Sequence, residues 1–66
     1  MIWQIIRTGM IRNDIKSIAE LAEITGLKSS TLQHERRTNP GSFRLYELKQ
    51  IADKLGLTNE ERRQMI

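Results

Sequence analysis

Apolar residues recur along this chain at intervals of three and four positions, and no segment alternates apolar with polar residues. This spacing puts apolar side chains on one face of a helix and predicts an all-α fold. A first helix ends near Asn13 and has one apolar face, made up of Trp3, Ile6 and Met10. Gly9 lies within this helix and weakens it by about 1 kcal/mol relative to alanine. We expect Trp3 in the core, with a partly exposed place at an interface as the alternative.

Capping and turn residues mark four further helices. Ser17–Glu20 and Thr58–Glu61 are capping boxes, and each of them opens a helix. Gly26 follows the first of these helices and suits the left-handed conformation that closes it. A polar helix over about residues 29–37 comes next and ends at the turn-forming residues 38–42. The helix after this loop has a continuous apolar face, made up of Leu45, Leu48, Ile51, Ala52 and Leu55.

Length and composition indicate one domain, residues 1–66, without crosslinks. A domain of about 60 residues buries only roughly 60% of its unfolded surface, and this chain has no cysteine and one histidine. We therefore expect no disulfide and no metal site. The chain lacks a glycine-rich phosphate loop and converging carboxylates, so no enzyme activity, cofactor or small-molecule ligand is expected. Its apolar runs are much shorter than the roughly 20 residues of a membrane span, which predicts a cytoplasmic protein without a membrane partner.

The net charge of +3 is concentrated in one part of the chain. Residues 28–44 contain four basic residues against the single acidic residue Glu35, whereas basic and acidic residues balance elsewhere. The four basic residues are Lys28, Arg36, Arg37 and Arg44. A surface that is merely solvated usually mixes its charges, so this segment is predicted to face a polyanion.

Residues 18–37 have the spacing of two helices joined by a very short turn. Ala22 is small enough for a close contact between the helices, and Gly26 tolerates positive φ in the turn. Leu32 would anchor the second helix, and Leu21 and Leu27 would complete the buried wedge. This combination resembles the Cro and cI repressor family, the lambda-repressor-like or XRE-type helix-turn-helix domains.

The resemblance covers about residues 2–57. After the loop at Asn39-Pro40, the apolar positions resemble the family's fourth helix, namely Phe43, Leu45, Leu48, Ile51-Ala52 and Leu55-Gly56-Leu57. One position departs from the pattern. Three residues after Leu32 the family usually has an apolar residue, whereas this chain has Glu35, which we expect to be exposed or paired with a neighbouring arginine.

The resemblance implies a compact five-helix fold and a sequence-specific regulator of transcription that binds double-stranded DNA. Such a protein, of phage or prophage Cro-like type, acts as a repressor by occupying an operator and excluding polymerase. The helix over about residues 29–37 would enter the major groove of the DNA.

If Leu32 points into the core, the opposite face of its helix carries Lys28, Ser29, Ser30, Gln33, His34 and Arg37. These side chains form hydrogen bonds to bases and phosphates, whereas a merely solvated helix would more often carry pairs of Glu and Lys. The resemblance implies base-edge contacts from Ser29, Ser30, Gln33 and His34. Gln33 is the leading candidate because its amide both donates and accepts, as adenine recognition requires. One of the two serines has helix capping as an alternative role.

The resemblance also implies phosphate contacts from Lys28, Arg36, Arg37, Asn39 and Arg44, with Tyr46 as a further candidate. It places the N-terminus of the first motif helix, here Ser17, against another phosphate, and helix N-termini favour anions. For Arg36 and Arg37 the alternative is a solvated pair at the C-terminal end of a helix, where positive charge is favourable.

The expected partners are double-stranded DNA and a second copy of the chain, in a weak or DNA-assisted homodimer. Leu57, Met65 and Ile66 are the candidates for the dimer contact. Two alternatives involve protein partners instead. In the first, the motif is a helical hairpin in a protein-binding bundle. In the second, the chain is an antitoxin-like or accessory helix-turn-helix protein whose main partner is another protein. An exposed apolar patch near the C-terminus would favour the latter.

Overall fold

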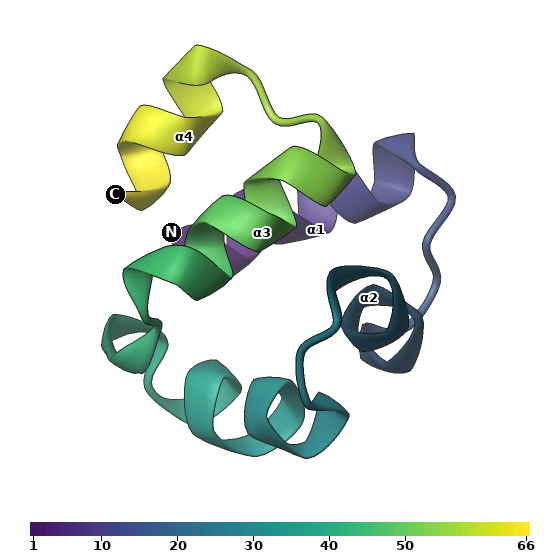
Figure 1. The fold of residues 1–66 in the computed structure, drawn as a ribbon. Helices are drawn as coiled ribbons and strands as arrows, with labels where there is room; N and C mark the ends of the chain where they lie inside the picture. The colour runs from purple at the N-terminus through teal and green to yellow at the C-terminus, as the bar shows by residue number, and fades with distance from the viewer.

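Five helices and one 3-10 turn follow one another along residues 1–66, which the computed structural model describes throughout (Figure 1). The first two helices are α1 (Ile2–Arg12) and α2 (Ile18–Thr25). Next comes η1 (Thr31–Arg36), a π-helical stretch with short α-helical segments on both sides, so that residues 29–38 form one continuous helix (helix 29–38). The 3-10 turn η2 (Pro40–Ser42) leads to α3 (Leu45–Leu55), and α4 (Asn59–Met65) follows. The all-α, five-helix prediction is confirmed, and no helix is both long and apolar enough to cross a membrane.

Local capping explains where α2 and α4 begin. Thr58 Oγ1 accepts the backbone N–H of Glu61 at 3.1 Å, and the Glu61 carboxylate accepts the N–H of Thr58 at 2.9 Å. The predicted capping box of α4 is therefore complete. At α2, Ser17 Oγ accepts the N–H of Glu20 at 3.2 Å. The Glu20 carboxylate, however, accepts the N–H of Lys16 at 3.5 Å rather than that of Ser17, so only half of the predicted box forms.

The core forms where the helices cross. Figure 1 shows α3 lying across α1, with α2 and helix 29–38 on one side and α4 on the other. The largest fully buried side chains come from four different helices and are Ile6, Leu21, Leu32 and Ile51. Each helix thus buries its apolar face against the others, and the fold depends on all of them together.

Three apolar residues near the C-terminal half of the chain lie differently from the prediction. Leu45, predicted on the inward face of α3, is 53% exposed, and the polar residue Glu47 occupies the buried place in that first turn. Leu57 and Met65, predicted as candidates for a dimer patch, are buried because α4 packs back against α1. Of the predicted patch of Leu57, Met65 and Ile66, only Ile66 is exposed, so these residues form no apolar patch on the surface.

Helix α1 and the end of α3 approach closely at Gly9. A Cβ atom at this buried position would lie 2.8 Å from Leu57 Cδ2 and 3.2 Å from Leu55 Cβ. Both distances are shorter than the roughly 3.5–4.0 Å at which carbon atoms attract each other best. The glycine that weakens α1 locally therefore allows its packing in the folded protein.

We expect Gly9→Ala to destabilise the protein by about 1–3 kcal/mol, because overpacking outweighs the roughly 1 kcal/mol gain in helix propensity. The matched control is Gln4→Ala on the exposed face of the same helix, which should change stability by less than about 0.5 kcal/mol. Thermal unfolding followed by circular dichroism measures both. A Gly9→Ala protein as stable as the wild type would contradict the close helix contact.

Candidate nucleic-acid interface

Helix α2 and helix 29–38 meet across a short turn built around Gly26. This glycine adopts a left-handed φ of 75°, and its N–H donates to the carbonyl of Ala22 at 2.9 Å. Ala22 is buried next to the turn, and Leu32 is fully buried in the following helix. The small contact residue, the turn residue and the anchor predicted from the sequence therefore all occupy the places expected of a helix-turn-helix unit.

The π-helical stretch η1 determines which side chains of helix 29–38 face the core. A π-turn closes i→i+5 hydrogen bonds and so holds one residue more than an α-turn. Leu32 and Arg36 are both buried, whereas the Glu35 side chain is 70% exposed. The inward position that Glu35 would hold three residues after Leu32 is therefore taken by Arg36, the next residue along the chain. This shift explains how a glutamate fits where an apolar residue is usual, and both expected fates of Glu35 occur, because it is exposed and contacts Arg36.

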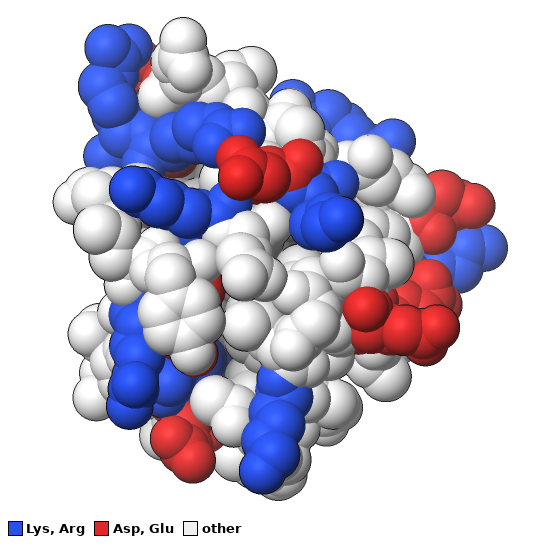
Figure 2. Space-filling model, in the orientation of Figure 1, with Lys and Arg blue, Asp and Glu red and all other residues white.

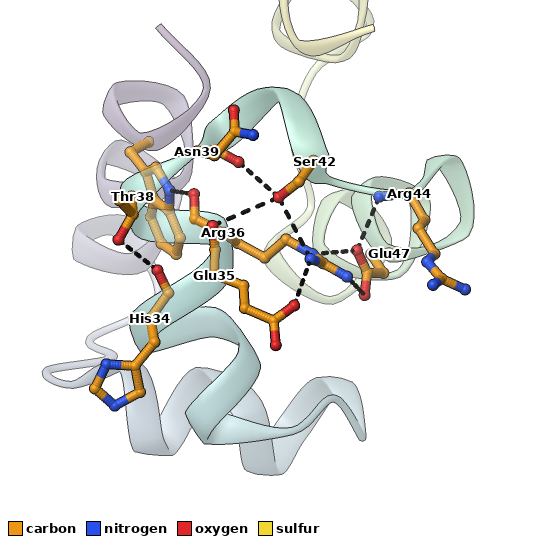
Figure 3. A network of polar contacts seen from close by, with 9 residues as sticks. His34, Glu35, Arg36, Thr38, Asn39, Ser42, Arg44 and Glu47 are labelled. Atoms are coloured by element: carbon orange, nitrogen blue, oxygen red, sulfur yellow. Dashed lines mark hydrogen bonds and ion pairs between the residues drawn. The ribbon is translucent and has the colours of Figure 1, made fainter.

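Arg36 forms a two-pronged ion pair with Glu47 from α3, which Figure 3 shows from close by. Its Nε donates to Glu47 Oε1 at 2.9 Å, and its Nη2 donates to Glu47 Oε2 at 3.2 Å. The two side chains are only 9% and 5% exposed. Glu47 Oε1 also accepts the backbone N–H of Arg44 at 2.8 Å, which fixes the first turn of α3. Buried charges are tolerated when they are paired and hydrogen-bonded in this way.

Further contacts connect Arg36 to its neighbour Glu35, to η2 and to α1. Its Nη1 donates to the Glu35 carboxylate and to Ser42 Oγ, both at 3.3 Å. Its backbone carbonyl accepts the indole N–H of Trp3 at 2.9 Å, and the Trp3 ring lies 5.6 Å from the ring of Phe43, between centroids. Trp3 is half-buried at the edge of the core. Helix 29–38 is therefore tied through one residue to α1, to the loop before α3 and to α3 itself.

The structure contradicts the prediction that Arg36 contacts a DNA phosphate. Every nitrogen of its guanidinium already donates to an acceptor within the protein, and its side chain is buried. The hydrogen bond to Glu47 raises the pKa of Arg36, although burial acts in the opposite direction. Burial likewise disfavours the charged form of Glu47, but the hydrogen bonds from Arg36 and Arg44 outweigh it and hold the pKa of Glu47 below its ordinary value. Both groups thus stay charged and bound to each other at neutral pH.

The face of helix 29–38 away from the core carries most of the predicted base-contacting residues. Ser30, Gln33 and His34 are exposed and Ser29 is half-buried. Gln33 Nε2 donates to Ser29 Oγ at 3.0 Å, a contact between residues one turn apart on the helix surface. Figure 3 shows the imidazole of His34 pointing away from the Arg36 network. None of these four side chains is used to hold the core together, so all remain available to a ligand.

The predicted phosphate-contacting residues other than Arg36 are all exposed; four of them line two grooves, and Asn39 lies apart from both. Ser17 and Arg37 line one groove, beside α1 and the start of α2. Lys28 and Arg44 line a second groove, together with Tyr46 and Gln50. Asn39 lies in the connection to η2, and Figure 3 shows its amide and the guanidinium of Arg44 pointing away from Arg36.

Gln50 was not among the predicted site residues. It lies four positions after Tyr46, one turn further along α3, and reaches the same groove as Lys28. This i, i+4 spacing on the exposed side of an amphipathic helix is the signal in the sequence that points to it.

Charge is distributed unevenly over the surface. Figure 2 shows acidic side chains gathered where Figure 1 places α2, and basic side chains with smaller acidic groups beside them along other parts of the same view. Within α2 the acidic residues are Glu20 and Glu23, both exposed. A polyanion would therefore avoid the acidic side of α2 and approach helix 29–38 and its neighbours. It could meet α2 only at its N-terminal end, where the exposed residues Lys16 and Ser17 lie.

We expect Glu47→Gln to lower stability at pH 7 by about 3 kcal/mol, because it leaves the buried guanidinium of Arg36 without a counter-charge. Glu35→Gln, at a 70% exposed carboxylate on the same guanidinium, is the matched control and should cost less than about 1 kcal/mol. Circular dichroism melting of both variants and the wild type measures the difference.

The same pair predicts a pH dependence. The pKa of Glu47 is lower in the folded chain than its ordinary value of 4.5, so its stabilising contribution is present above pH 4.5 and is lost as the pH falls through the lower, folded value. The melting temperature of the wild type should fall below pH 4.5 more steeply than that of Glu47→Gln. Parallel pH profiles of the two proteins would contradict the role given to Glu47.

Comparison with known proteins agrees with this geometry. The family model for the Cro/C1-type HTH DNA-binding domain matches residues 6–61, a range that begins in α1 and ends in α4. No curated protein and no solved structure matches the chain. The matched range includes the whole helix-turn-helix unit and the Arg36–Glu47 pair. The chain therefore belongs to the family of Cro/C1-type helix-turn-helix DNA-binding domains, the lambda-repressor-like or XRE-type family.

Proposed function

We propose that residues 1–66 act as a single, sequence-specific DNA-binding unit of a transcriptional regulator. The observation that carries the proposal is the exposed face of helix 29–38. Leu32 and Arg36 are buried and fix the helix against the core. Ser30, Gln33 and His34 are exposed on the opposite face and make no contact in the core. A major groove about 12 Å wide admits a helix whose exposed face carries such hydrogen-bonding side chains.

Within this proposal, Gln33 is the main base-reading residue. Its Nε2 is held by Ser29 Oγ at 3.0 Å, which limits the side chain to few orientations before DNA binds. A glutamine amide placed in this way can both donate to and accept from the edge of an adenine. Ser29, Ser30 and His34 would contact neighbouring base edges from the same face.

The phosphate contacts would come from both sides of this face. Ser17 presents the N-terminus of α2, whose backbone amides and dipole favour an anion. Lys28, Arg37, Asn39 and Arg44 would bind the backbone around it, and none of them has a role in the core that competes with this. Such contacts position a protein on DNA without distinguishing sequences.

We further propose a repressor of phage or prophage Cro-like type. It would occupy an operator as a weak or DNA-assisted homodimer, with two copies on half-sites about one helical turn apart. Family membership and the small size of the chain support this, because a short domain reaches sufficient specificity most simply by doubling its contacts. The alternative, an accessory protein docked through its C-terminal apolar patch, loses support because Leu57 and Met65 are buried. The same burial removes the predicted dimer contact, so the two copies would be held together by the DNA rather than by these residues.

Fluorescence anisotropy of a labelled random duplex, titrated with protein at several salt concentrations, tests DNA binding and the role of Arg37 together. We expect the logarithm of the binding constant to fall linearly with the logarithm of salt concentration. Arg37→Ala should weaken binding to all sequences alike and reduce the salt slope by about one unit. Arg63→Ala, on the exposed side of α4, is the matched control and should leave the slope unchanged. A folded protein without binding at low salt would refute the proposal, and an unchanged slope in Arg37→Ala would remove Arg37 from the phosphate contacts.

Selection from a random pool gives the preferred duplex on which Gln33 is tested. Gln33→Ala should cost about 1–3 kcal/mol on that duplex, relax the preference at one base pair, and leave binding to random DNA unchanged. Gln64→Ala, a glutamine substitution in α4, serves as the control. Equal weakening on every sequence would make Gln33 a positioning residue rather than a base-reading one.

A further inference from the structure

A groove of about 740 Å³ lies along α1, separate from the base-reading face of helix 29–38. Its walls are α1, the connection to α2 and the side chain of Arg37. Neither Gln33 nor any other predicted base-contacting residue lines it. The functions proposed above therefore leave most of this groove without a role.

Apolar side chains make up half of the lining. They are Trp3, Met10, Ile11, Ile15 and Ile18. Four of them are half-buried, and Ile11 is 73% exposed. Trp3, Met10, Ile15 and Ile18 pack against the core and show only part of their surface in the groove, so Ile11 is its one largely exposed apolar residue. The groove therefore offers a partner a narrow apolar stripe with Ile11 at its most exposed point.

The rim of the groove is cationic. Arg7, Lys16 and Arg37 line it, against the single acidic residue Asp14. Asp14 contacts Lys16 only loosely, at 3.9 Å between highly exposed side chains. Arg7 and Arg37 take part in none of the protein's ion pairs. A complementary partner would accordingly carry carboxylates beside an apolar stripe.

We propose that this groove binds an acidic amphipathic helix of a partner protein, and that the partner thereby competes with DNA. An amphipathic helix binds by laying its apolar face into such a groove, with its carboxylates against Arg7, Lys16 and Arg37. Ser17 and Arg37 line the groove and are also proposed phosphate contacts. The competition, but not the docking itself, rests on the proposed function.

Two other occupants fit less well. A small ligand is usually buried over 70% or more of its surface, whereas this groove is open and includes the exposed Ile11. A second copy could offer the acidic surface of α2, with Glu20 and Glu23. That contact would join different surfaces of the two copies, and such head-to-tail contacts form rings or open chains rather than a two-fold dimer.

The test uses a synthetic peptide of about 14 residues, or roughly four helical turns, with leucine on one face and glutamate on the other. A peptide of the same composition in scrambled order is the control. Trp3 is the only tryptophan of the chain and lines the groove, so its fluorescence reports binding without DNA. We expect the amphipathic peptide, but not the scrambled one, to change this fluorescence. Ile11→Glu should weaken binding at least about tenfold through lost apolar burial and added repulsion. Ile66→Glu, a change at an equally exposed isoleucine outside the groove, should not.

Competition is measured separately by adding the peptide to the protein bound to labelled DNA. We expect displacement from the wild type and little displacement from Ile11→Glu. Both proteins are compared at the same fractional saturation of the DNA, because a carboxylate in the groove of Arg37 would itself weaken phosphate binding. No Trp3 response at about 1 mM peptide, or equal responses to both peptides, would overturn the docking proposal. Equally strong binding of octanoate, a small apolar carboxylate, would also overturn it, because the groove would then be a small-ligand site. Self-association that Ile11→Glu abolishes would overturn it as well, because the occupant would then be a second copy of the chain. Peptide binding without displacement would overturn the competition alone, and a protein that binds the peptide but no DNA would overturn the proposed function while the docking site stands.

Discussion

The ion pair between Arg36 and Glu47 is the contact on which the arrangement of helix 29–38 depends. It is the one place where the core buries two full charges, with side chains only 9% and 5% exposed. Replacing such a pair by apolar residues often costs nothing in stability, so its value lies more in geometry than in energy. A two-pronged arginine–carboxylate contact allows few orientations. Because the backbone of Arg36 also binds Trp3, the same residue fixes helix 29–38 against α1 and α3 at once.

This arrangement separates the cations of the basic segment into two kinds. Arg36 turns inward and is neutralised by Glu47, while its neighbour Arg37 turns outward and remains free of ion pairs. The π-helical stretch makes this division possible, because it moves Glu35 out of the core and brings Arg36 into it. The cations left for DNA are thus fewer than the sequence suggests, but one of them, Arg37, lies on a helix whose orientation is fixed before DNA arrives. Such preorganisation reduces the ordering that binding requires.

The groove along α1 connects DNA binding with a second kind of recognition. Arg37 and Ser17 belong both to that groove and to the proposed phosphate contacts, so a carboxylate and a phosphate would compete for the same cation. In a chain of 66 residues there is little surface that serves only one partner. Regulation by overlap of two binding surfaces needs no conformational change, since it requires only that the two ligands exclude each other.

The helices, the helix-turn-helix unit and the exposed face that carries Gln33 can be predicted from the sequence. These features follow from apolar periodicity, capping residues and the left-handed Gly26, all of which act over a few neighbouring residues. The burial of Arg36, Leu57 and Met65, by contrast, follows from how the helices pack against one another. Nothing in the residues around Arg36 indicates that it will pair with a glutamate eleven positions later. An apolar helix face likewise does not show whether its own domain or a second copy of the chain will cover it. Pairing and burial depend on residues far apart in the chain, and no local pattern specifies them.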